Sequence, residues 1–86
     1  MALLDEFQAA QPRGSKNAAA AALGVPRARW GDWQNGTRPV PDAYIVRMAR
    51  ATGRDPGAML AAAHAEREVN PDTAAVWRAL AARAAA

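Results

Sequence analysis

Apolar residues recur along most of this chain at the three- and four-residue spacing of an amphipathic helix, and no segment shows the sustained alternation of a strand. At the start, this spacing predicts a first helix over Ala2 to Gln11, with Leu3, Leu4, Phe7 and Ala10 on its apolar side. The helix-breaking sequence Pro12-Arg13-Gly14 ends it. We therefore expect an all-α fold in which turn residues mark the ends of the helices.

A second and a third helix are predicted between Ser15 and Gly36. Ser15 is a suitable N-cap for the alanine-rich segment Lys16 to Leu23, and Gly24 is suited to the positive φ that commonly ends a helix. Pro26 then favours the first turn of another helix, predicted over Pro26 to Asn35. Asn35-Gly36 ends that helix.

Three further helices are predicted from similar signals. Pro41-Asp42 opens the fourth, which ends at Gly53, while Asp55-Pro56 opens the fifth and Asn70-Pro71 opens the sixth. Their apolar sides carry Ile45, Met48, Ala49 and Thr52 in the fourth helix, Met59, Leu60 and Ala63 in the fifth, and Val76, Trp77 and Leu80 in the sixth. The sixth helix has only about four turns, so it must dock on its own domain or on another subunit to be stable.

The connection between the second and third helices is the most informative feature of the pattern. Gly24-Val25-Pro26 is so short that the two helices must cross steeply, as in a helix-turn-helix. At 100° per residue, Trp30 and Trp33 fall on the inner side of the third helix, and Arg27, Ala28, Gly31, Asp32 and Asn35 fall on the outer side. This outer side is small and polar, as a helix that enters a major groove requires. We expect the alanines of the second helix to leave room for the Trp30 indole.

Composition limits the classes of protein to which the chain can belong. Its 86 residues support one domain, and it has no cysteine. The single His64 cannot build a metal site, so we expect it to pack on a helix face, and no cofactor or small-molecule ligand is indicated. The N-terminus turns acidic too early for a secretory signal and no apolar stretch could span a membrane, so a cytoplasmic location is expected. No constellation of residues suggests an enzyme.

Positive charge is concentrated in the centre of the chain. The formal net charge is +3. Residues 13 to 54 contain eight basic and two acidic residues, a net charge of +6, whereas the rest contains three basic and six acidic residues, a net charge of −3. A localised positive field is expected of a protein that neutralises phosphates.

Two segments give the chain a resemblance to a known family. Ala22-Leu23-Gly24-Val25-Pro26-Arg27 and Trp33-Gln34-Asn35-Gly36 are similar to the helix-turn-helix of lambda-repressor-like and Cro-type DNA-binding domains. Asp55-Pro56 and the segment Leu60 to Arg67 resemble a small phage-associated branch of that family. The resemblance covers residues 2 to 69 and implies a compact five-helix domain that usually binds operator DNA as a dimer. Residues 70 to 86 would then be an added C-terminal helix.

The resemblance and the helical faces together predict which residues contact DNA. Base readers are Arg27, Ala28, Gly31 and Asp32, of which Arg27 suits guanine O6 and N7. Phosphate contacts are assigned to Lys16, Asn17, Arg29, Asn35, Thr37 and Arg38. Arg29 could instead pair with Asp32 on its own helix. The last helix is expected to support a homodimer through Val76, Trp77 and Leu80.

Two functions are consistent with this sequence. The first is a transcriptional regulator that reads double-stranded operator DNA, of the phage or prophage repressor or Cro-like type. The second is a protein-interaction module, such as an anti-repressor or an antitoxin, that keeps the fold and acts mainly through its last helix. The basic centre favours DNA.

Overall fold

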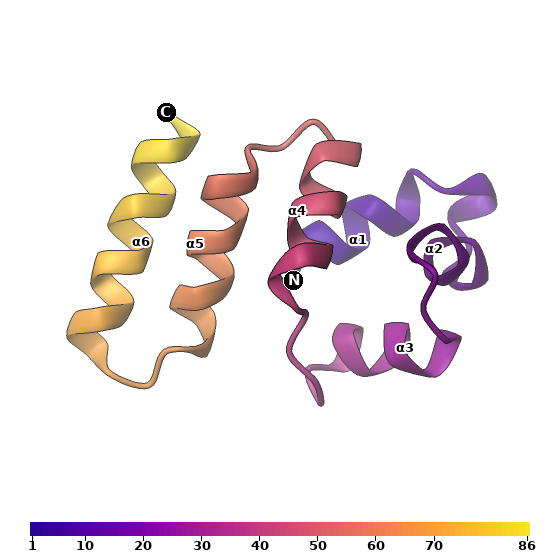
Figure 1. Ribbon diagram of the computed structural model, residues 1–86, viewed down its shortest axis with the longest axis horizontal. Helices are drawn as coiled ribbons and strands as arrows, with labels where there is room; N and C mark the ends of the chain where they lie inside the picture. The colour runs from indigo at the N-terminus through magenta and orange to yellow at the C-terminus, as the bar shows by residue number, and fades with distance from the viewer.

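The computed structural model describes residues 1–86 and contains six α-helices, one 3₁₀ helix and no strand, which confirms the all-α prediction. The helices are α1 (Ala2–Ala9), η1 (Pro12–Gly14), α2 (Lys16–Leu23), α3 (Arg27–Asn35), α4 (Asp42–Ala51), α5 (Pro56–Arg67) and α6 (Pro71–Ala85). Figure 1 shows α1 to α4 gathered at one end of the long axis and the α5–α6 pair at the other. None of the helices has the length and apolar character that a membrane span requires.

Side-chain caps begin three of the helices where the sequence predicts them. The side chains of Ser15, Asp55 and Asn70 each accept a hydrogen bond from a backbone amide three residues later, at 3.2, 2.8 and 3.0 Å respectively. Pro56 and Pro71 occupy the first helical positions of α5 and α6, where the missing N–H has no helical partner to lose. These helix starts are therefore set by local chemistry.

The first helix ends earlier than the pattern predicts. α1 stops at Ala9 instead of Gln11, and Ala10 is exposed instead of lying on the apolar side. Pro12 cannot donate a backbone hydrogen bond, and the Gln11 side chain folds back to donate to the Phe7 carbonyl at 3.1 Å. The chain then makes the short helix η1 before α2.

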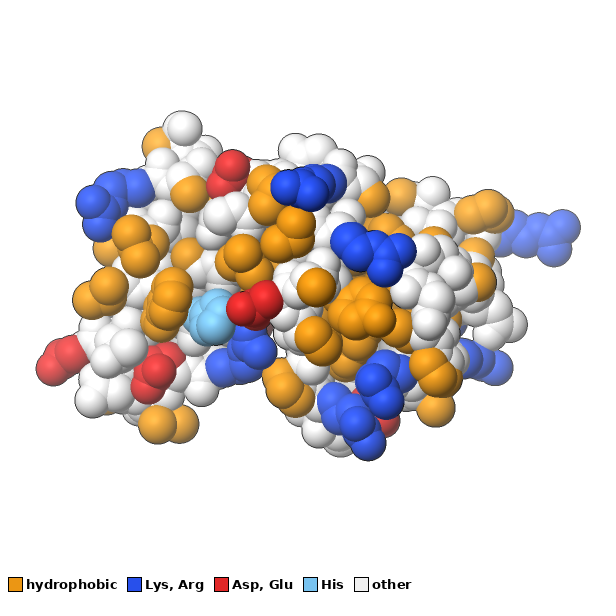
Figure 2. All heavy atoms as spheres, viewed as in Figure 1, with side chains coloured by type: hydrophobic (Ala, Val, Ile, Leu, Met, Phe, Trp, Pro, Cys, Tyr) orange, Lys and Arg blue, Asp and Glu red, His pale blue; other side chains and the backbone are white.

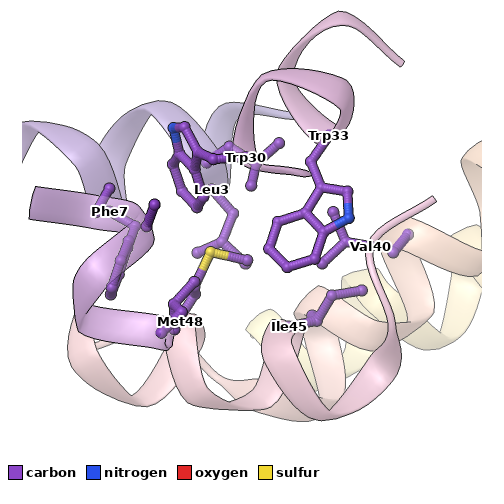
Figure 3. Close-up of a cluster of buried hydrophobic side chains, with 12 residues drawn as sticks. Leu3, Phe7, Trp30, Trp33, Val40, Ile45 and Met48 are labelled. Atoms are coloured by element: carbon purple, nitrogen blue, oxygen red, sulfur yellow. The ribbon is translucent and has the colours of Figure 1, made fainter. Parts of the chain in front are cut away.

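The tryptophans of α3 lie at the centre of the core. Trp30 is completely buried and Trp33 nearly so, and Figure 3 shows both indoles directed from α3 toward side chains of α1 and α4. Ring centroids follow one another from Phe7 to Trp30 at 5.9 Å, from Trp30 to Trp33 at 6.1 Å and from Trp33 to Tyr44 at 5.1 Å. The predicted inner side of α3 is thus confirmed.

Small residues of α2 share the core with the Trp30 indole. Ala19 and Ala20 are buried in the same cluster of twelve residues, whereas Ala21 and Ala22 face solvent. Two buried methyl groups in place of larger side chains leave volume for an indole. The expectation that α2 accommodates Trp30 therefore holds for the two inward-facing alanines.

The last two helices form an antiparallel pair that rests on α4 (Figure 1). Their buried side chains are small: Ala58, Ala61, Ala63 and Ala65 on α5, and Ala74 on α6. Ala63 belongs to the main core, and Met59 and Leu60 pack against it. α5 therefore joins the four-helix core on one side and carries α6 on the other.

Candidate nucleic-acid interface

A three-residue connection, Gly24 to Pro26, links α2 to α3. Gly24 adopts φ 69°, its amide donates to the Ala21 carbonyl at 3.1 Å, and the Val25 amide donates to the Ala20 carbonyl at 3.0 Å. This pair of bonds is a Schellman motif, which satisfies the last carbonyls of α2 while the chain reverses. Pro26 is the N-cap of α3 instead of its first residue, so the helix begins at Arg27. The turn is therefore short, and both of its backbone amides are hydrogen-bonded.

The predicted outer side of α3 is accessible along its length. Arg27, Ala28 and Asn35 are exposed, and Gly31 and Asp32 are half-buried. Trp30 and Trp33 anchor the opposite side in the core. The structure thus brings the four proposed base readers together on one helix face.

Three basic residues at the starts of α2 and α3 have no acidic partner. Lys16 is the first residue of α2, Arg27 is the first residue of α3, and Arg29 lies two residues further along α3. Neither helix has an acidic residue in its first turn. No ion pair of the structure involves any of the three. The N-terminus of a helix already carries partial positive charge, so cations there are uncompensated within the protein. An anion such as a phosphate would compensate them.

The other end of α3 holds a small polar cluster. Asp32 pairs with Arg38 at 3.3 Å, so the alternative in which Arg29 is its helical partner is not what the structure shows. The Thr37 hydroxyl lies 2.8 Å from the Asn35 carboxamide oxygen and 3.2 Å from an Asp32 carboxylate oxygen. The single hydroxyl hydrogen of Thr37 is therefore engaged internally, which leaves Thr37 only its acceptor capacity. Arg38 neutralises the one acidic group on the outer side of α3.

Two basic residues of the central segment have structural roles that the charge count cannot reveal. Arg47 on α4 donates to the carbonyls of Leu23 at 3.3 Å and Ala22 at 3.2 Å, the C-terminal end of α2. Arg54 forms a bidentate pair with Glu6, and its hydrogen bonds hold the pKa of the Glu6 carboxyl below its ordinary value of 4.5. Basic side chains still predominate over α1 to α4 on the face shown in Figure 2, and most acidic ones lie toward α5 and α6.

Gln8 of α1 and Gln34 of α3 have structural roles that no sequence pattern indicated. The Gln8 carboxamide oxygen accepts hydrogen bonds from the Trp30 indole N–H at 3.0 Å and from the Gln34 side-chain amide at 2.8 Å. Its amide nitrogen donates to the Gly14 carbonyl at 3.0 Å. The signal available in the sequence was Trp30 itself, because a buried indole N–H needs an acceptor.

Of the three residues of α6 predicted to form a dimer interface, one packs within the chain and two are exposed to solvent. Trp77 is half-buried and stacks on His64 of α5 with ring centroids 4.7 Å apart, so His64 packs on a neighbouring helix as expected. Val76 and Leu80 are 59% and 41% exposed. His64 also bonds Asp42 at 3.1 Å, as does Arg67 at 3.3 Å, and together they hold the pKa of the Asp42 carboxyl below its ordinary value of 3.8.

Comparisons with known proteins give no relative for this chain: no family model, curated protein or solved structure matches it. Within the structure, no three His, Asp or Glu side chains come together in a way that could hold a metal ion. The functional reading of the site therefore depends on its own geometry and charge.

Proposed function

We propose that this protein is a sequence-specific, double-stranded DNA-binding regulator of transcription that inserts α3 into the major groove. The observation that carries the proposal is the division of α3 into two sides. Two buried tryptophans hold one side in the core. The other side is a basic surface with small residues, and its one acidic residue, Asp32, is paired with Arg38. A recognition helix needs both a rigid seat and a surface able to approach base edges. The activity proposed is binding alone, without a catalytic step.

In this proposal α2 and α3 act as a helix-turn-helix of the repressor or Cro-like type. Arg27, Ala28, Gly31 and Asp32 face base edges, with Arg27 at the start of α3 bidentate to a guanine. The phosphate contacts come from the residues around them: Lys16, Asn17, Arg29, Asn35, Thr37 and Arg38. Lys16 and the free amides at the start of α2 would meet the DNA backbone there. A homodimer formed through α6 would present two such units to a palindromic operator.

One observation favours a second candidate function, that of a protein-interaction module. Val76 and Leu80 on α6 are exposed although they are apolar, and α6 lies away from α3 (Figure 1). An anti-repressor or antitoxin would use this surface for a protein partner. The uncompensated cations at the start of α3 favour DNA over this alternative.

The direct test is a salt titration of binding to DNA sites selected from a random library. We expect affinity to fall steeply between about 50 and 200 mM salt, because Lys16, Arg27 and Arg29 displace counterions. Arg27→Ala should cost about 1–3 kcal/mol on the selected site and relax the preference at one base pair. Lys16→Ala should weaken selected and random DNA alike and reduce the salt slope by about one.

Fluorescence anisotropy with labelled duplexes gives both affinities in one experiment. Equal losses on selected and random DNA for Arg27→Ala would remove Arg27 from the base readers. Negligible binding of any duplex at low salt, with capture of a protein partner through α6, would favour the interaction module instead.

A further inference from the structure

One side chain of α1 connects the start of α2 to two positions on α3. Gln8 accepts from the Trp30 indole N–H at 3.0 Å and from the Gln34 amide at 2.8 Å, and it donates to the Gly14 carbonyl at 3.0 Å. Gly14 directly precedes Ser15, the N-cap of α2. The carboxamide oxygen of Gln8 thus bonds α3, and its amide nitrogen bonds the last residue of η1, which precedes the α2 N-cap.

The two contacts on α3 are placed where they can control its rotation. Trp30 and Gln34 are four residues apart, so their side chains leave the same side of the helix about one turn apart. Two directional bonds at separate heights constrain both the rotation of a helix about its axis and its shift along that axis. A single bond would constrain neither fully.

The packing of Trp30 and Trp33 in the core seats α3, and directional bonds can fix its rotation more finely than apolar contact does. Contact between apolar surfaces is non-directional, and α2 presents only Ala19, Ala20 and Leu23 to the core beside α3. Short alanine side chains interlock little with an indole. The bonds of Gln8 therefore add a directional restraint between α1, η1 and α3 to this packing.

We infer that Gln8 is a positioning residue that sets the rotation of α3 and, through it, the base edges that Arg27, Ala28 and Gly31 meet. The inference rests on the proposed DNA-binding function for its effect on specificity. Productive recognition requires groups held within about 0.5 Å and 10–20° of their working geometry, so a small rotation of α3 is enough to mismatch its outer side chains with the groove. Gln8 would contribute no contact to the DNA itself.

The test compares two substitutions of Gln8 that differ in which bonds they keep. Gln8→Met has similar length and flexibility but removes all three bonds, whereas Gln8→Glu keeps acceptor oxygens for Trp30 and Gln34 and loses only the donor to Gly14. We expect Gln8→Met to lower the ratio of selected-site to random-DNA affinity by about tenfold, a loss comparable to one base contact, while random-DNA affinity at low salt is unchanged. Gln8→Glu should restore most of that ratio.

A second readout follows α3 without DNA. The indole N–H resonance of Trp30 should shift and exchange faster with solvent in Gln8→Met, and stay near its wild-type position in Gln8→Glu. Ile45→Val serves as the control, because it trims the core without touching any of these bonds. It should lower the melting temperature and leave both the affinity ratio and the Trp30 resonance unchanged.

The outcomes separate the inference from the proposed function. An unchanged ratio and an unchanged Trp30 resonance in Gln8→Met overturn the inference, and so does an equal fall of the ratio in Ile45→Val. A wild-type protein that prefers no DNA sequence overturns the proposed function, and the Trp30 resonance then still decides whether Gln8 holds α3.

Discussion

Gly31 lies in the middle of α3, where glycine is unfavourable, and the protein gives no internal reason for it. A Cβ added at Gly31 would meet no heavy atom within 4 Å, and the residue has no positive φ that would require glycine. Its neighbours on the outer side, Arg27 and Ala28, are exposed. A requirement for a missing side chain at this position would therefore come from a partner that approaches α3 closely.

Replacing Gly31 should move stability and binding in opposite directions. Gly31→Ala is expected to raise the free energy of unfolding by about 1 kcal/mol, since alanine restricts the unfolded chain and favours the helix. If α3 enters the groove as proposed, affinity for selected DNA should fall, because the new methyl group would occupy the surface that meets the base edges. Urea denaturation and anisotropy measure the two effects. Gly57→Ala on α5 is the control and should leave DNA binding unchanged, and unchanged binding in Gly31→Ala would show that the groove does not need glycine there.

Asp42 joins the start of α4 to α5 and should contribute a small acid-sensitive part of the stability. Hydrogen bonds from His64 and then Arg67 lower the pKa of Asp42 in the folded protein, so this contribution is fully present above pH 3.8 and is lost as the pH falls through the lower folded-state value. The side chain is 54% exposed, so the size should be below about 1 kcal/mol. The difference in unfolding free energy between wild type and Asp42→Asn should therefore shrink from about pH 6 to about pH 2.5. A difference that is constant over this range contradicts the assignment.

At the scale of helices, the sequence predicts those features that are caused by residues close together in the chain. Ser15, Asp55 and Asn70 cap helices by accepting from amides three residues away, so these helix starts can be predicted from the local sequence. The inner side of α3 follows from helical periodicity in the same way. The bonds of Gln8 to Trp30 and Gln34 join residues 22 and 26 positions apart, and no local pattern encodes such pairs. The sequence therefore predicts both sides of α3 but not the hydrogen bonds of Gln8 that tie this helix to α1.

The role of Arg47 likewise depends on residues far away in the sequence, so a count of charges does not predict it. The sequence counts it toward the basic centre, whereas in the structure its guanidinium caps the C-terminal carbonyls of α2 and lies 5.7 Å from the Tyr44 ring centre. A cation at the C-terminal end of a helix compensates its partial negative charge. The positive field available for phosphates is thus smaller than the count suggests.

Removing that cap should destabilise the protein without changing the salt dependence of DNA binding. Arg47→Met keeps an aliphatic stem and should cost about 1 kcal/mol of unfolding free energy, because two carbonyls of α2 lose a charged donor. Arg50→Met is the matched control, since Arg50 is exposed on the same helix and has no ion pair or side-chain hydrogen bond in the structure. Thermal or urea unfolding compares the two. A fall of the salt slope by about one in Arg47→Met would instead assign Arg47 to phosphate contact.

At the scale of the whole molecule, α6 lies at one end of the long axis (Figure 1). It packs mainly on α5, through Ala74 and the stacked rings of Trp77 and His64, and contributes nothing to the main core cluster. His64 thus has Trp77 of α6 against its ring and the Asp42 carboxylate of α4 at its Nε2. Trp77 therefore packs against α5 within the chain. The apolar surface that remains exposed for another subunit is the strip formed by Val76 and Leu80.

That strip is the basis for the expected homodimer. Val76 and Leu80 lie four residues apart and so on one side of α6. A two-fold axis at this strip would join two copies at their α6 ends and leave the two α3 helices on the outside, because α3 lies beyond α4 and α5 from α6 (Figure 1). Such a dimer would suit a palindromic operator if its α3 helices lie one DNA turn, about 34 Å, apart.

Sedimentation of four forms of the chain separates the dimer contact from internal docking. Wild type should sediment as a dimer, and Val76→Ser combined with Leu80→Ser should be monomeric with little change in stability, because both side chains face solvent within one chain. Trp77→Ala should lower the unfolding free energy by about 1–3 kcal/mol, since it removes a half-buried indole that holds α6 on α5. Ala79→Ser, an exposed change on α6, is the control and should stay dimeric. A wild-type chain that is monomeric at high concentration, both free and on DNA, would contradict the dimer and leave Trp77 with the single role of docking α6 on α5.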